Sequence, residues 1–113
     1  MDPKNLLEDK IYSLERIEHV TKGMRQEGFA DDINAQDVVI RRFAVIGEAA
    51  NKLPKELKEK HPEVEWKDII KMRNFLLHEY FDIDVRIVWD TIKEDLPRLK
   101  TKIAKILDKQ GSE

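Results

Sequence analysis

Residues that break helices are scarce in this chain and lie far apart, and this spacing limits what the chain can fold into. Glycine occurs only at positions 23, 28, 47 and 111, and proline only at positions 3, 54, 62 and 97. Because these two residues punctuate a polypeptide most strongly, the long stretches between them favour long helices. No run of residues alternates apolar and polar side chains over the length of a strand. The sequence therefore predicts an all-α protein.

Apolar residues recur at helical spacing in both long segments of the first half. The first predicted helix opens with Pro3, which suits the first helical position, and ends at Gly28. Residues 29–34 form a short connection. A second helix runs from about 35 to 53, with Gly47 in its middle, where close packing against another helix explains the missing side chain.

The second half of the chain continues this pattern. A short polar helix covers residues 55–60, and a third long helix runs from about 65 to 79. Asp84 can cap a fourth helix, which Pro97 kinks or restarts, before a frayed tail from about residue 108. Four long helices with short connections predict an antiparallel four-helix bundle, formed as a single domain by the whole chain.

Charge and cysteine content narrow the classes of function. Charged residues make up 39% of the chain, yet the formal net charge is only -2. A protein that binds nucleic acid mainly by neutralising phosphates is usually strongly basic, so any RNA contact must be local or assembled from more than one chain. The absence of cysteine excludes disulfides, thiol nucleophiles and thiolate metal sites. With no signal peptide and no bilayer-length apolar run, we expect a soluble, cytoplasmic protein without membrane contacts.

The side chains best suited to catalysis lie in the segment 71–80, Lys-Met-Arg-Asn-Phe-Leu-Leu-His-Glu-Tyr. Asn74 and His78 are four residues apart and share a helix face. Arg73 and His78 are five residues apart, which places them about 140° apart around an ideal helix. Either Arg73 folds back towards the imidazole, or a second copy of the helix completes the pair across a dimer interface.

Arginine and histidine suit the cleavage of RNA by transesterification. Histidine moves protons near neutral pH, and a guanidinium can hold the negative charge of a phosphorane-like transition state. No metal or cofactor is needed for this chemistry. Asn74 could orient the imidazole or bind a phosphate oxygen. Spacing alone also leaves open that Arg73 is a surface charge and His78 a packed or solvated side chain.

The order of short motifs along the chain carries a family resemblance. Arg73 to His78 resembles the R-x4-6-H motif of HEPN-domain ribonucleases, and with Glu79 and Tyr80 it becomes R-x4-H-x-Y, which is similar to the HepT toxins. The resemblance extends from about Asp9 to Leu107. Further matching segments are Val45-Ile46-Gly47-Glu48-Ala49-Ala50, His61-Pro62 followed by Trp66, and Trp89 with Asp95-Leu96-Pro97.

The resemblance implies the HEPN helical bundle and a role in a toxin–antitoxin pair. Arg73 and His78 match the catalytic pair of the family, and Asn74 matches the polar residue that follows the arginine. Tyr80 matches the tyrosine that a minimal nucleotidyltransferase antitoxin modifies with AMP, which switches the toxin off. The resemblance also implies a homodimer whose two motifs face each other and form a composite RNA-cleaving site.

Glu48 and Lys71 could line this cleft. Glu48 also stands four residues before Lys52, which is the spacing of an ordinary helical ion pair and favours a structural role. A solvated position is the simpler interpretation of Lys71, as it is of Lys67 and Arg86.

The tryptophans and the two remaining histidines have simpler interpretations. Trp66 and Trp89 could stack on a base, but their helical positions favour the core. His19 and His61 have no ligand partners at metal spacing, and we expect no metal site.

Three functions stay open at this stage. The first is a metal-independent endoribonuclease toxin. The second is a non-catalytic HEPN module that binds nucleotide or scaffolds the nucleotidyltransferase, with Tyr80 as its substrate residue. The third is a purely structural helical protein. A complete arginine–histidine pair favours the ribonuclease.

Overall fold

The fold is seen in a computed structural model, which describes residues 3–78 and 84–112, except for the side chains of residues 76–78 and 110–112. Within those ranges the chain is helical and contains no strand, so the all-α prediction is confirmed. The elements are α1 (Pro3–Thr21), α2 (Gln26–Asp31), α3 (Ile33–Lys52), α4 (Lys55–Lys60), α5 (Trp66–His78), α6 (Val85–Asp90), the π-helical segment η2 (Thr91–Asp95) and α7 (Leu96–Ser112).

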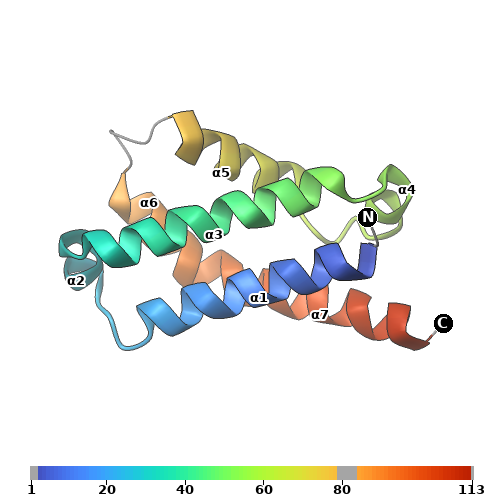
Figure 1. The fold of residues 1–113 in the computed structure, drawn as a ribbon, viewed down its shortest axis with the longest axis horizontal. Coiled ribbons are helices and arrows are strands. Elements are labelled where there is room, and N and C mark those ends of the chain that lie inside the picture. The colour runs from blue at the N-terminus through green and yellow to red at the C-terminus, as the bar shows by residue number, and fades with distance from the viewer. Residues whose placement is uncertain (1–2, 79–83, 113) are drawn as a thin grey trace.

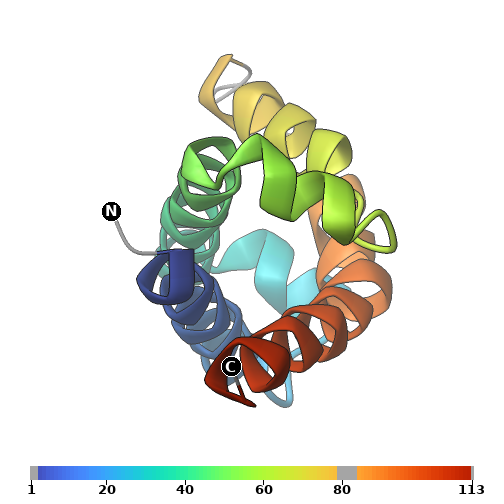
Figure 2. The same ribbon diagram turned by 90° about the vertical axis from the view of Figure 1, so that its right-hand side faces the viewer.

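The long helices α1, α3, α5 and α7 alternate in direction along the longest axis, as an antiparallel bundle requires (Figure 1). Seen end-on, they enclose the interior, with α4 across one end and α2 across the other (Figure 2). The molecule extends 45 × 28 × 22 Å along its principal axes. Each of the four long helices thus faces the interior with one side and leaves the opposite side to solvent.

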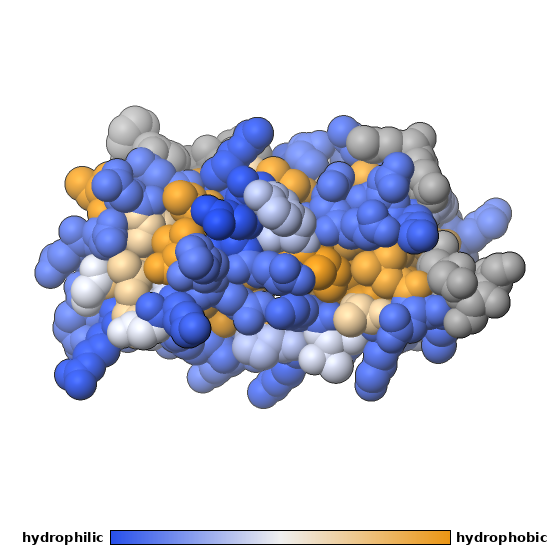
Figure 3. Space-filling view, turned by 60° about the horizontal axis from the view of Figure 1, so that its bottom comes forward, coloured by the Kyte–Doolittle hydropathy of each residue, from blue (hydrophilic) through white to orange (hydrophobic). Residues whose placement is uncertain are grey.

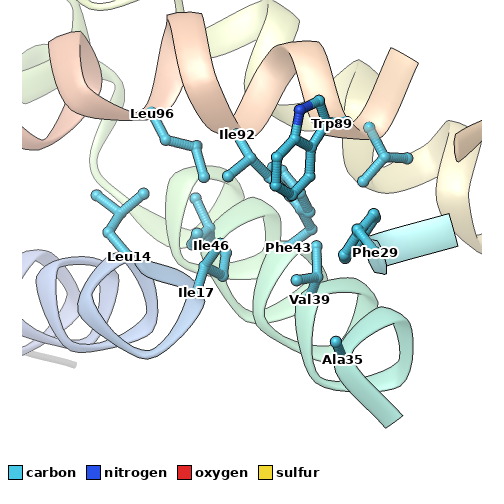
Figure 4. Close-up of a cluster of buried hydrophobic side chains, with 11 residues drawn as sticks. Leu14, Ile17, Phe29, Ala35, Val39, Phe43, Ile46, Trp89, Ile92 and Leu96 are labelled. Carbon is cyan, nitrogen blue, oxygen red and sulfur yellow. The ribbon is translucent and has the colours of Figure 1, made fainter. Parts of the chain in front are cut away.

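Two apolar clusters fill the bundle. In the first, Phe29 of α2 and Trp89 of α6 point towards Phe43 of α3, and the Phe29 and Trp89 ring centroids lie 5.3 Å apart (Figure 4). The second cluster lies nearer the chain termini and includes Trp66. Both tryptophans are buried, as the sequence predicted. The remaining buried members of the second cluster are Leu6, Leu7, Ala49, Ala50, Leu53, Leu57, Val64, Ile103 and Ile106.

The first helix ends earlier than the sequence predicted. It stops at Thr21 because Gly23 adopts a φ of 76°, a left-handed conformation that glycine reaches without steric cost. Gly28, the predicted end, instead lies inside α2. The predicted connection 29–34 contains the end of this additional helix and the cap of the next, since Asp32 accepts a hydrogen bond from the Ala35 amide.

The last predicted helix is continuous but irregular. Asp84 caps it as predicted, accepting a hydrogen bond from the Arg86 amide at 2.9 Å. The irregularity expected at Pro97 takes the form of the π-helical segment η2, just before it in the chain, where the missing proline N–H removes a helical hydrogen bond. The helix then continues to Ser112, beyond residue 108, where a frayed tail was expected.

Hydrophilic side chains dominate the face that α1 and α7 form, with apolar atoms in separate patches between them (Figure 3). In the described ranges, no helix combines the length and the apolarity needed to cross a bilayer.

Candidate active site

The candidate site lies where α5 crosses α3. Gly47 is buried at this crossing, and a Cβ placed on it would collide with the Cβ of Arg73 and lie 2.6 Å from its Cγ. The helices can approach this closely only because position 47 has no side chain. Close helix packing at Gly47 is therefore confirmed, and the side chain packed against it is the arginine of the predicted catalytic pair.

Arg73 extends across to α3 and forms an ion pair there. Its Nη2 lies 2.6 Å from Oε1 of Glu48. The Arg73 side chain is 17% exposed and that of Glu48 is 50% exposed, so one partner is largely enclosed and the other faces solvent. The buried Nε of Arg73 has no hydrogen-bond partner among the described residues. Arg73 is thus an anchored cation at a helix crossing, and not a freely moving surface charge.

Glu48 has a different partner from the one its helical spacing suggested. The spacing with Lys52 favoured an ion pair along α3, whereas the ion pair found joins Glu48 to Arg73 on α5. The structure thus places Glu48 in the candidate site. Charge-assisted hydrogen bonds of this length are the strong ones, because donor and acceptor are both ionised.

The other described polar residues of the motif helix face solvent. Lys67, Lys71 and Asn74 are exposed and follow one another at intervals of four and three residues, so they share one face of α5. The next register position on this face, four residues after Asn74, belongs to His78. The His78 side chain and the whole of Tyr80 lie outside the described residues, so the roles expected for both stay predictions.

Comparison with known proteins identifies the family of this chain. The sequence profile described as "Ribonuclease HepT-like" matches residues 11–106. The chain belongs to the HepT-like family. A protein of Thermococcus cleftensis named "Probable ribonuclease HepT" is 43% identical over 103 residues, covering 91% of this chain and 94% of its own. A protein of Caldanaerobacter subterraneus named "Putative RNase" is 39% identical over 108 residues, covering 96% of both chains. No solved structure gives a significant match.

In this HepT-like chain, the residues that lead into the motif helix are fixed by one tryptophan. The indole Nε1 of Trp66 donates a hydrogen bond to the carbonyl oxygen of His61 at 3.0 Å, which closes the loop before α5. The His61 Nδ1 lies 3.2 Å from Oε1 of Glu63. These contacts hold the loop directly before α5. His61 consequently has a structural position.

A second enclosed cation of this chain was not predicted from the sequence. Lys10 of α1 is fully buried, and its Nζ lies 4.5 Å from the centroid of the Trp66 ring. That Nζ has no hydrogen-bond partner among the described residues. Burial, and then the nearby charge of Lys58, lower the pKa of Lys10 to about 7. Lys10 lies over Trp66, a member of the second apolar cluster, and has no contact with Arg73 or Glu48 among those observed.

Proposed function

We propose that this HepT-like protein is the toxin of a toxin–antitoxin pair, acting as a metal-independent endoribonuclease with Arg73 and His78 at its active centre. The anchoring of Arg73 by Glu48, above Gly47, carries the proposal. Enclosing a guanidinium at a helix crossing carries a desolvation cost, and a functional role for this arginine would account for it. The ribonuclease names of the relatives support the same activity.

The proposed chemistry is an internal transesterification. The 2′-oxygen of a ribose attacks the adjacent phosphorus, and the bond from phosphorus to the 5′-oxygen of the next nucleotide breaks. His78 removes the proton of the 2′-hydroxyl or supplies one to the departing 5′-oxygen, as an imidazole can near neutral pH. The products are a 2′,3′-cyclic phosphate and a free 5′-hydroxyl, and this step consumes no water.

Arg73 stabilises the negative charge that gathers on the phosphorus oxygens in the transition state. A guanidinium has five N–H donors, and the contact with Glu48 engages Nη2. Because Nε is buried, the donors left for phosphate are Nη1 and the second N–H of Nη2. Because Glu48 fixes the guanidinium before substrate arrives, little reorganisation is needed during the reaction. Glu48 is a positioning residue in this scheme.

The site is composite and uses two copies of the chain. Arg73 projects towards α3, whereas the register of His78 continues the exposed face of Lys71 and Asn74. Side chains five residues apart diverge by about 140° on one helix, but two facing helices can bring the arginine of one to the histidine of the other. A homodimer also concentrates cations locally, as a chain with a net charge of -2 requires for RNA binding.

The proposed regulation acts on Tyr80. A nucleotidyltransferase antitoxin transfers AMP from ATP to the phenolic oxygen and releases pyrophosphate. Tyr80 follows His78 by two residues, so the product is a bulky anion beside the site. It would repel the RNA backbone, as other added phosphates repel anions.

The test is cleavage of total RNA and tRNA by purified protein in EDTA, after mass spectrometry has confirmed that Tyr80 is unmodified. His78→Ala and Arg73→Ala are compared with His19→Ala and Arg25→Ala, which remove the same residue types at exposed positions outside the site. We expect cyclic-phosphate ends from the wild type and both controls, and none from the two site variants. An inactive wild type would favour the non-catalytic scaffold for a nucleotidyltransferase. Cleavage that survives both site substitutions would place the chemistry elsewhere.

A further inference from the structure

A hollow lies on the other flank of α3 from the Arg73 crossing. It has a volume of about 230 Å³ and opens between α1 and α3. Asp9 lines it from α1, and Arg41, Glu48 and Lys52 line it from α3. Glu48 therefore belongs to two places, because it borders this hollow and also binds Arg73. A ligand in the hollow would lie beside Glu48, the residue that positions the proposed catalytic arginine.

An exposed aromatic ring lies on α1 one helical turn beyond Asp9, outside the residues that line the hollow. Tyr12 is 56% exposed, and the guanidinium carbon of Arg42 lies 5.2 Å from its ring centroid. Tyr12 follows Asp9 by three residues and therefore lies on the same side of α1, one turn further along. The Arg42 guanidinium covers one face of the ring and places a positive charge beside it. An aromatic ring this exposed gains little from packing in the folded chain.

Two cations flank the hollow along α3. Arg41 and Lys52 are exposed, and neither forms an ion pair with another described residue. At a rise of 1.5 Å per residue they stand about 16 Å apart along the helix. Two cations at this separation can contact different phosphates of one nucleic acid strand. Glu48 lies between them in sequence.

We propose that an unpaired nucleotide of the RNA substrate binds in this α1–α3 groove, with its base stacked on Tyr12 and phosphates along its strand on Arg41 and Lys52. The proposal rests on the ribonuclease function proposed above and specifies its substrate as single-stranded at this point. Proteins bind single strands by stacking bases on exposed aromatic rings next to cations that contact the phosphates. A paired base is stacked within its duplex and cannot reach the ring.

The first test measures binding without cleavage. A fluorescent octamer of 2′-O-methyl RNA, which has no 2′-hydroxyl nucleophile, is titrated with wild-type protein, Tyr12→Ala, Tyr12→Phe, and Arg41→Gln combined with Lys52→Gln. Lys105→Gln, which removes an exposed cation of α7, is the control. We expect Tyr12→Ala to weaken binding about tenfold or more, and Tyr12→Phe and the control to bind like the wild type. The double variant should bind more weakly and with a smaller dependence on salt.

The second test locates the base. RNA carrying 4-thiouridine is cross-linked by light, and the adduct should map to the tryptic peptide between Lys10 and Arg16, which contains Tyr12. If Tyr12→Ala binds RNA as tightly as the wild type and the cross-links map elsewhere, the groove proposal is overturned and the ribonuclease proposal stays intact. A wild type that neither binds nor cleaves RNA would overturn both. The octamer annealed to its complement is titrated in the same way, and binding as tight as that of the single strand would overturn the specification of an unpaired base.

Discussion

A side chain placed on Gly47 would overlap the side chain of Arg73. The glycine of one helix and the motif arginine of another therefore occupy a single crossing, where the backbone of α3 supports the aliphatic part of Arg73. The next residue of α3, Glu48, then binds the guanidinium of the same arginine. The Gly-Glu pair thus supports Arg73 in two ways, by leaving room for its stem and by holding its charge.

Gly47→Ala should lower both stability and RNA cleavage. Alanine improves helix propensity by about 1 kcal/mol, but overpacking of a close helix crossing costs about 1–3 kcal/mol. The net loss should appear as a lower midpoint in urea unfolding. Cleavage should fall further than unfolding explains, because Arg73 must move. Gly28→Ala is the matched control, since a Cβ there meets nothing within 4 Å. Unchanged cleavage by Gly47→Ala would show that the position of Arg73 is not critical.

Removing the partner of Arg73 should reduce turnover more than binding. Glu48→Ala leaves the guanidinium largely enclosed without its carboxylate, which should cost about 1–2 kcal/mol of stability. We expect kcat for RNA cleavage to fall at least tenfold, since the guanidinium is no longer preorganised. Glu48→Gln keeps an oxygen acceptor and should recover part of the loss. Faster cleavage by Glu48→Gln would show that Glu48 masks Arg73 and does not position it.

A surface ion pair provides the control for Glu48. Glu59 lies 3.9 Å from Lys55, and their side chains are 64% and 88% exposed. Glu59→Ala should change stability by less than about 1 kcal/mol and leave cleavage unaffected, as is usual for solvated ion pairs.

Lys10 should make the protein more stable as pH rises above neutrality. Its pKa is lowered from 10.5 to about 7 in the folded protein, so the unfolded chain binds more protons between these values. The free energy of unfolding should therefore rise with pH across this window, by an upper limit of about 5 kcal/mol. Below pH 7 the contribution is constant, because Lys10 is protonated in both states.

Lys10→Met tests this pH dependence in urea unfolding at pH 7 and pH 9.5. At pH 7 the free energy of unfolding of the variant should exceed that of the wild type by about 2 kcal/mol or more, because the variant buries no cation. The advantage should shrink at pH 9.5. Lys105→Met, at an exposed position, should show neither effect. A variant that is less stable at both pH values would mean that the Lys10 contact with Trp66 outweighs its burial.

Local signals predicted the helices that carry their own caps and breaks. Asp84 accepts the predicted capping hydrogen bond, and α4 has the predicted bounds Lys55–Lys60. The helix α2 was missed because its stability is not local. Its six residues contain a glycine, and Phe29 holds them in place by packing on Trp89, far away in the sequence. Helical periodicity does not report such a contact.

In the candidate site, too, local sequence signals predicted some features, whereas others depend on contacts between distant parts of the chain. The motif identified Arg73, but the spacing of Glu48 pointed to Lys52, and the contact with Arg73 requires α3 and α5 to pack through Gly47. Lys10 had a sequence signal that went unused. It stands three residues after Leu7 and four before Leu14, which is the spacing of a buried stripe.

Subunit mixing tests most directly whether Arg73 of one copy works with His78 of another. Arg73→Ala and His78→Ala proteins, each inactive alone, are unfolded together in urea, refolded as a mixture and assayed on RNA in EDTA. Half of the dimers then carry one of each chain, and each of these holds one intact composite site of two, so about a quarter of wild-type activity should return. No activity in a mixture whose mixed dimers are verified by mass spectrometry would contradict a site shared between copies.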